Sequence, residues 1–243
     1  MSEHIHFISD LHLSDDRSDI TQCFLSYLST LDSSVSSLYI LGDFFDVWVG
    51  DDDQSSPIPK ISNGLKEAVK KGLKIFFQPG NRDFLIGDVF LKNTGLIPLA
   101  DETLIDLFGK KILLMHGDLL CTDDVEYQQF RALSHSQQWK NDLLSKPLQE
   151  RLAIGQHYRH QSHRHKENKS AAIMDVNSKT VIKQMQKHQA LTLIHGHTHR
   201  PAVHDFVING QPAQRIVLAE WDEKGSVLDW TEQGYTIKAL KIK

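Results

Sequence analysis

Five short apolar runs along the chain each end at a polar side chain or at a glycine that precedes one. They cover residues 5–9, 38–41, 73–77, 111–115 and 191–194. Runs this short, bounded by turn residues, predict buried strands. Between them, residues 19–31 and 61–71 carry apolar side chains at helical spacing, which predicts amphipathic helices. The order strand, helix, strand favours parallel strands in an α/β fold.

The pattern changes after residue 200. Four β-like segments follow at residues 203–208, 215–218, 226–230 and 235–242, separated by glycine-containing turns. This spacing predicts a run of antiparallel hairpins, which we expect to form a second sheet. Three further elements are expected between residues 84 and 187. They are a short helix at 84–93, a strand at 103–107 that pairs with 111–115, and a helix at 178–187.

Residues 123–177 form a mostly helical stretch without a strand signal. Between residues 131 and 169 there are eight Lys or Arg against three Asp or Glu, with five His. A charge run of this kind is typical of a solvated helical face. Because apolar and basic residues alternate here, the stretch also suits an amphipathic ligand with an anionic head, or a membrane surface. Both readings stay open on this pattern alone.

Composition places the chain among ordinary globular proteins. With 243 residues, 40% hydrophobic and 24% charged, it is expected to form one domain over 1–243, with the helical cap 123–177 inserted into it. A net charge of −4 argues against a general nucleic-acid binder. Two cysteines form no disulfide framework, which fits a reducing compartment. No signal peptide or membrane-spanning run is evident, so we expect a cytoplasmic protein, or one on the cytosolic side of a membrane.

The strand ends carry the candidate chemistry. In order they read Asp10-x-His12, Gly42-Asp43, Gly80-Asn81-Arg82-Asp83, His116-Gly117-Asp118 and His195-Gly196-His197-x-His199. Carboxylate, amide and imidazole donors without a thiolate favour a harder divalent ion such as Mn²⁺, with Fe²⁺, Co²⁺ and Zn²⁺ not excluded. If the chain stays extended, Asp10 and His12 point to the same face. Arg82 suits a phosphate oxygen, whereas the acids Asp51-Asp52-Asp53 are interpreted as a solvated loop.

This ordered set of five blocks resembles the calcineurin-like metallophosphoesterase superfamily. The resemblance implies a sandwich of two mixed sheets flanked by helices, and two Mn²⁺ ions per chain that activate water for attack on phosphorus. It assigns one ion to Asp10, His12, Asp43 and His197, and the other to Asp43, Asn81, His116 and His195. Asp43 thus bridges both ions, and Asp83, Asp118 and His199 orient the ligands. The implied catalytic residues are Asp43, Asn81, Arg82 and His195.

A narrower resemblance extends over nearly the whole chain. Segments such as Gly80-Asn-Arg-Asp-Phe-Leu-Ile-Gly, Cys121-Thr-Asp-Asp and Ile173-Met-Asp-Val-Asn are similar to those of the bacterial UDP-2,3-diacylglucosamine pyrophosphatases of lipid A biosynthesis. The resemblance implies that hydroxide attacks the phosphorus next to uridine and releases UMP and 2,3-diacylglucosamine 1-phosphate. The implied substrate contacts are Asn81, Arg82, Asp124, Ser162, Lys166, Lys169 and His195. Lys166 departs from the family, which often has Asn there, so its role is in doubt.

The resemblance also implies partners. It predicts a UDP-linked diacyl amino sugar as substrate and a peripheral position on the cytoplasmic face of the bacterial inner membrane. We expect no nucleic-acid partner and a monomer. Two alternatives remain at this stage: another metallophosphoesterase that acts on a nucleotide phosphodiester, and a non-catalytic scaffold. The apolar cap argues against the first, and the intact ligand set argues against the second.

Overall fold

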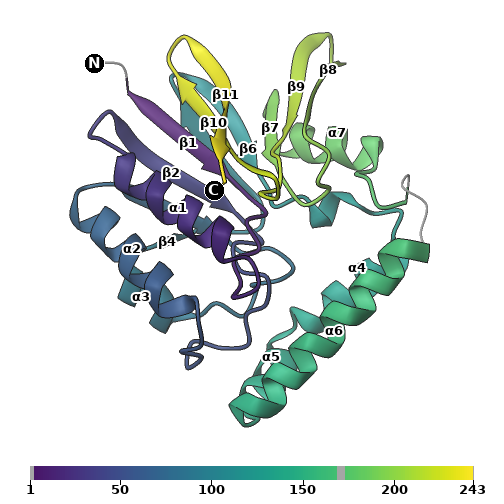
Figure 1. Cartoon of the computed structure of the whole chain (residues 1–243). Helices are drawn as coiled ribbons and strands as arrows, with labels where there is room; N and C mark the ends of the chain where they lie inside the picture. The colour runs from purple at the N-terminus through teal and green to yellow at the C-terminus, as the bar shows by residue number, and fades with distance from the viewer. Residues whose placement is uncertain (1–2, 169–172, 243) are drawn as a thin grey trace.

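The computed structural model describes residues 3–168 and 173–242, with side chains described for all of these except residues 163–168. Two mixed sheets form its centre (Figure 1). In spatial order, the first sheet contains β11 (Gly234–Lys241), β10 (Lys224–Thr231), β1 (His4–Ile8), β2 (Val35–Leu41), β3 (Lys74–Gln78) and β4 (Ile97–Pro98). The second sheet contains β5 (Thr103–Leu107), β6 (Lys110–Leu114), β7 (Thr192–His195), β9 (Gln211–Val217) and β8 (Ala202–Ile208).

The five predicted apolar runs form parallel strands, which β4 and β9 extend. β1, β2, β3 and β4 run parallel in the first sheet, and β6, β7 and β9 run parallel in the second. The helix α1 (Ser18–Thr30) connects β1 to β2, and α2 (Ile58–Lys70) connects β2 to β3. The predicted βαβ order is therefore confirmed. The carboxyl ends of these strands lie at the sheet edge where ligands bind in α/β proteins.

The prediction for the last four strands is wrong in its topology. They do form two hairpins, but the hairpins belong to different sheets: β8 and β9 extend the second sheet, whereas β10 and β11 extend the first. The reason is that β1 has a free edge on the side away from β2. β10 pairs antiparallel with that edge, with Ile5 opposite Trp230.

Three apolar layers hold the sandwich together. Between the two sheets lie side chains such as Phe7, Leu41, Leu114 and Ile194, all fully buried. The outer face of the first sheet packs against α1, α2 and α3 (Asp88–Thr94), and the outer face of the second packs against α7 (Ser178–Lys187) (Figure 1). The α/β/β/α sandwich is thus confirmed.

Three helices lie beside the sandwich, below the strand ends in Figure 1. These cap helices are α4 (Val125–Ser134), α5 (Gln137–Leu144) and α6 (Leu148–Asn168), and α4 follows the short 3-10 helix η1 (Asp118–Leu120). Arg151 anchors α6 to the sandwich: it donates to the carbonyl of Val49 at 2.6 Å and pairs with Asp52. Among the described residues no helix is both long and apolar enough to cross a membrane.

The loop of three acids is solvated only at Asp52, whose side chain is 61% exposed, which corrects the sequence interpretation. Asp53 is 5% exposed, and Asp51 accepts hydrogen bonds from the backbone N–H groups of Gly87 and Phe90 at 2.9 and 3.0 Å. These bonds satisfy the free donors at the start of α3. They also explain why α3 begins at Asp88 and not, as predicted, at residue 84.

Asp51→Ala is expected to lower the free energy of unfolding by about 1–3 kcal/mol, because it leaves three partly buried N–H groups, those of Gly87, Phe90 and the Trp48 indole, without an acceptor. Thermal unfolding measures this loss. Asp88→Ala, which removes an exposed acid of the same helix, should leave the melting temperature nearly unchanged. Equal melting temperatures for wild type and Asp51→Ala would show that water replaces the carboxylate without cost.

Candidate active site

The predicted ligands meet where the strands of both sheets end. Within the first sheet, the backbone N–H of Asp10 donates to the carbonyl of Gly42 at 3.0 Å. Within the second, the N–H of Gly196 donates to the carbonyl of His116 at 2.8 Å. The two sheets are joined by a hydrogen bond of 2.9 Å from the N–H of His197 to Asp10 Oδ2. One compact site thus collects residues that are far apart in the sequence.

The backbone at this edge is unusual. Asp10, His12, Asp43, His197 and His199 all have positive φ, between 48° and 69°. Non-glycine residues adopt this region rarely, and such strain is concentrated at functional sites. The extended conformation assumed for Asp10-x-His12 is therefore wrong: the chain turns at both residues, with the His12 N–H donating to the Asp43 carbonyl at 3.0 Å. The turn still brings the two side chains together.

Asp10, His12 and His199 form the first group of side chains that can hold a metal ion. Asp10 is fully buried, and its Oδ2 accepts from Ser9 Oγ at 2.6 Å. Its Oδ1 accepts no hydrogen bond from the described residues and lies 3.5 Å from His199 Nε2. His199, to which the resemblance assigned only an orienting role, is thus itself a member of a group that can hold a metal ion. His199 Nδ1 in turn pairs with Glu220.

Asp43, His116 and His197 form the second group. The Nδ1 of His116 lies 2.9 Å from the carbonyl of Leu41, so Nδ1–H can donate there and leave the Nε2 lone pair for a metal. That Nε2 lies 3.0 Å from Asn81 Oδ1 and 3.6 Å from Asp43 Oδ1. Three predicted ligands of one ion, Asp43, Asn81 and His116, are therefore neighbours.

His195 is placed differently from its predicted partners. It is fully buried, its Nδ1 lies 2.8 Å from the carbonyl of Gly196, and its Nε2 lies 3.1 Å from Arg215 Nη1. Burial is the main reason that the pKa of His195 falls to about 4, so the ring is neutral at neutral pH. A neutral ring is the form that binds metal. Its assignment as a ligand and as a substrate contact remains a prediction.

Glycines let the strand ends approach one another closely. Gly42 has φ of +85°, and a Cβ atom there would lie 2.4 Å from His116 Nδ1. At Gly80 a Cβ atom would lie 2.3 Å from Asp43 Oδ1. Neither contact is possible for a larger residue. The two glycines before Asp43 and Asn81 therefore belong to the geometry of the site.

The electrostatics of the site favour cations. Asp10, Asp43, Asp83 and Asp118 are all at most 3% exposed. Burial, and after it the charge of Asp43, raises the pKa of Asp83 to about 7. Burial lowers the pKa of His116, but the carboxylates of Asp43, Asp10 and Asp118 outweigh it and raise the pKa to about 9. So many buried carboxylates require a compensating positive charge.

Tyr127 and Arg131 were not assigned a role from the sequence, but they join the cap to the site. Tyr127 donates to Asp118 Oδ2 at 2.9 Å, and Arg131 Nε donates to the same oxygen at 2.5 Å. Both lie on α4, four residues apart. That spacing places the two side chains on one face of a helix. The spacing was the feature of the sequence from which a shared partner could have been predicted.

Asp46 was also missed. It is 6% exposed, its Oδ2 pairs with Arg159 Nη1 at 2.6 Å, and its Oδ1 lies 4.0 Å from Arg82 Nη1. Asp46 thus links α6 of the cap to the strand-end loop that follows β2. The sequence feature that could have identified Asp46 is its place inside the apolar segment 44–49, because a buried charge needs a partner.

A cavity of about 410 Å³ extends from the strand ends into the cap. Four of the predicted substrate residues line it: Asn81, Arg82, Asp124 and Ser162. Asp124 also accepts from the N–H of Tyr127 at 3.1 Å and so begins α4. The side chain of Lys166 and the whole of Lys169 lie outside the described residues, so their substrate contacts remain predictions.

Comparisons with known proteins identify the family of the chain. The family model for calcineurin-like phosphoesterases matches residues 3–201. The UDP-2,3-diacylglucosamine hydrolase of Marinobacter nauticus is 48% identical over 217 residues, which cover 89% of each chain. The enzyme of the same name from Salmonella agona is 43% identical over 236 residues, covering 97% of this chain and 98% of the relative. Vacuolar protein sorting 29 of Cryptosporidium parvum shares the fold, with a TM-score of 0.51 at 13% identity over 100% of this chain and 92% of that chain.

The chain therefore belongs to the calcineurin-like phosphoesterase family. Within that family, the curated relatives that it matches over most of their length are UDP-2,3-diacylglucosamine hydrolases. The sequence resemblance to both the broad and the narrow group is confirmed.

Proposed function

We propose that this protein hydrolyses the pyrophosphate bond of UDP-2,3-diacylglucosamine, giving UMP and 2,3-diacylglucosamine 1-phosphate, a step of lipid A biosynthesis. The names of its relatives support the substrate, and the site supports phosphoester-type hydrolysis. The reaction adds one water across the P–O–P bond, so that each product carries one phosphate.

One observation carries the proposal: a single cavity joins the polar strand ends to apolar cap side chains. Asn81 and Arg82 line one part, whereas Phe130, Trp139 and Tyr158 of the cap line another. A lipid with a pyrophosphate head needs both surfaces. Each buried methylene of an acyl chain contributes about 0.8 kcal/mol, so the cap supplies much of the binding. We accordingly propose that the helical segment 123–177 is a cap inserted into a single domain.

The residues at the strand ends fit a pair of divalent ions. Asp10 Oδ1 is a buried oxygen that accepts no hydrogen bond from the described residues, and the two groups supply three ligand atoms each. We propose Mn²⁺ at both positions, with Asp10, His12, Asp43 and His197 for one ion and Asp43, Asn81, His116 and His195 for the other. When bound, such ions lower the pKa of water and stabilise the oxygens of an in-line displacement.

The chain's own residues orient the reactants. The backbone N–H of Arg82 donates to Asp43 Oδ1 at 2.8 Å and fixes that carboxylate. The guanidinium of Arg82 lines the cavity and is available to a phosphate oxygen. Asp83 accepts from the N–H groups of Gly80 and Phe44, both at 2.7 Å, and so holds the loops that carry Asn81 and Asp43.

The substrate also suggests where the protein acts. A diacylated sugar is held in a bilayer by its acyl chains. We propose that the protein binds peripherally to the cytoplasmic face of the bacterial inner membrane, as a monomer, with the open side of the cavity toward the lipid. Vesicle flotation with and without substrate tests this placement.

Arg82→Ala is expected to lower kcat about 10²- to 10³-fold, the usual cost of losing one electrostatic contact to the transition state. Metal content should stay at the wild-type level, because the bond to Asp43 comes from the backbone N–H. Steady-state kinetics and metal analysis of the same sample measure both. Loss of metal together with activity would give Arg82 a structural role instead.

The function itself is tested by turnover. Purified protein supplemented with Mn²⁺ should release UMP and the lipid monophosphate from UDP-2,3-diacylglucosamine in detergent, and EDTA should stop the reaction. Hydrolysis of bis(p-nitrophenyl) phosphate without hydrolysis of the lipid would favour the alternative of a nucleotide phosphodiesterase. No turnover of either substrate by metal-loaded protein would favour the scaffold.

A further inference from the structure

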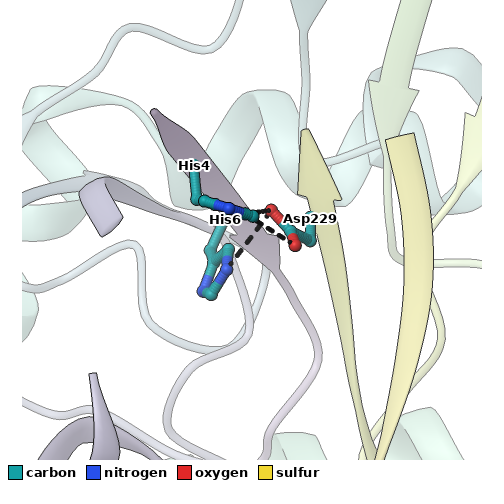
Figure 2. A group of neighbouring side chains, drawn as sticks. All are labelled: His4, His6 and Asp229. Atoms are coloured by element: carbon teal, nitrogen blue, oxygen red, sulfur yellow. Dashed lines mark hydrogen bonds and ion pairs between the residues drawn. The ribbon is translucent and has the colours of Figure 1, made fainter. Parts of the chain in front are cut away.

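A second cluster of metal-ligating side chains lies away from the strand ends. His4 and His6 come from β1 and Asp229 from the neighbouring β10, as Figure 2 shows. His6 is directly opposite Asp229 in the antiparallel pair, and His4 is two residues from His6 on the same face. The cluster lies at the amino end of β1, whereas Asp10 follows its carboxyl end. It is therefore separate from the candidate active site.

The distances suit a tetrahedral ion. His4 Nδ1 lies 2.8 Å from Asp229 Oδ1, and His6 Nε2 lies 3.5 Å from the same oxygen. Zinc binds imidazole nitrogen and carboxylate oxygen at about 2.0–2.2 Å. Two ligands of a tetrahedral ion at that range are about 3.3–3.5 Å apart, so the His6 and Asp229 atoms already have the required separation. His4 has to move away from the carboxylate oxygen by about 0.5–0.7 Å to reach that separation.

The Nε2 atom of His6 is buried and makes no hydrogen bond in the described structure. His6 is 5% exposed, and its Nε2 has no hydrogen-bond partner among the described residues. The other ring nitrogen, Nδ1, lies 2.7 Å from the hydroxyl of Tyr27. In the tautomer that donates from Nδ1 to the Tyr27 oxygen, Nε2 carries a lone pair, and this atom lies 3.5 Å from Asp229 Oδ1 (Figure 2). Fixing the tautomer through the second nitrogen is how proteins prepare a histidine ligand.

The charges around the cluster are compatible with a bound cation. Burial lowers the pKa of His6 to about 4, so the ring is neutral at neutral pH and needs no deprotonation to bind metal. Lys238 Nζ pairs with Asp229 Oδ2 at 2.6 Å, an oxygen that also lies 2.9 Å from His4 Nδ1. The Lys238 side chain is 52% exposed, so its ammonium group can move into solvent. The ammonium group of Lys238 therefore competes with a metal ion for the carboxylate of Asp229.

We propose that His4 Nδ1, His6 Nε2 and Asp229 Oδ1 form a third metal site, for Zn²⁺ or a similar divalent ion, with water as the fourth ligand. His4 is 27% exposed, which gives the water and the ion access from solvent. The ion would join β1 to β10, and thereby the first strand of the chain to its last hairpin. Its effect is on stability, because a ligand that binds only the folded state raises the melting temperature.

The test compares Zn²⁺ content in chelator-stripped protein after dialysis against limiting ZnCl₂. We expect wild type to retain one more Zn²⁺ per chain than His4→Asn and His6→Gln, and to gain more in melting temperature on Zn²⁺ addition. Ions at the active site cancel in this comparison, because the variants keep all of its ligands. His4→Asn alters a partly exposed residue and keeps the test valid if His6→Gln fails to fold.

Two further variants sharpen the comparison. Lys238→Ala should bind Zn²⁺ several-fold more tightly, because it removes the competing ammonium group. His188→Asn is the matched control. His188 and Lys187 pair with Glu102 in the same way as His4 and Lys238 pair with Asp229. The cluster around Glu102 contains no second histidine among the described residues. His188→Asn should keep wild-type Zn²⁺ content. Equal Zn²⁺ content in wild type and His4→Asn, or no effect of Lys238→Ala on affinity, would overturn the proposal.

Discussion

Asp43→Ala is expected to abolish turnover of UDP-2,3-diacylglucosamine, with a loss larger than the about 10²- to 10³-fold typical of a single electrostatic contact. Asp43 is the predicted bridge between both ions, and it is 2% exposed. Its Oδ1 lies 3.6 Å from His116 Nε2 and accepts from the Arg82 N–H. Because the proposed assignment gives Asp43 to both ions, removing the carboxylate should weaken both metal positions, so metal content should fall with activity.

Asp43→Asn separates charge from shape in this experiment. The amide oxygen can still accept from the Arg82 N–H, so the fold is kept while the negative charge is lost. Turnover and metal content should fall nearly as far as in the alanine variant. Glu67→Ala, which removes an exposed acid of α2, should behave as wild type. Turnover of Asp43→Ala within tenfold of wild type would refute the bridging assignment.

The second large effect concerns the cap. Phe130→Ala and Tyr158→Ala are each expected to raise KM for a substrate with long acyl chains about 10- to 100-fold, since burial against one aromatic side chain contributes about 1.5–3 kcal/mol. Their rings are 5.1 Å apart, and both line the cavity. KM for a substrate with short acyl chains should change much less, because fewer methylenes reach the cap.

Leu133→Ala is the matched control for the cap. Leu133 is an apolar residue of α4 like Phe130, but it is 59% exposed and does not line the cavity. It should leave KM for both substrates unchanged. If Phe130→Ala and Tyr158→Ala raise KM equally for long and short acyl chains, the cap stabilises the site but does not bind the lipid.

Local patterns predicted the strands well, and the topology only in part. The apolar runs before Asp10, Asp43, Asn81 and His116 are buried strands. They were predictable because a strand covered on both faces consists of consecutive apolar residues. The separation of the last two hairpins between the sheets was not predictable from these patterns. The sheet that each hairpin joins depends on which strand has an unpaired edge. The local sequence of a hairpin does not indicate which strand it will pair with. The two-residue strand β4 is too short for any periodic signal.

The sequence could propose members of the site mainly where they follow strands. Asn81, Arg82, Asp124 and Ser162 line one cavity in the structure, and their roles toward a substrate remain predictions. The contacts between the cap and the strand-end loops were not predicted: Asp46 with Arg159, and Asp118 with Tyr127 and Arg131. They join the strand-end loops to helices far along the chain, and one sequence without relatives carries little information on such long-range pairs.

The most direct measurement of the central claim is turnover of UDP-2,3-diacylglucosamine in H₂¹⁸O with Mn²⁺ present. The account predicts one ¹⁸O atom in the phosphate of UMP and unlabelled 2,3-diacylglucosamine 1-phosphate, because water attacks the phosphorus next to uridine. Label in the lipid phosphate would contradict the direction of attack. Absence of both products from metal-loaded protein would contradict the proposed function itself.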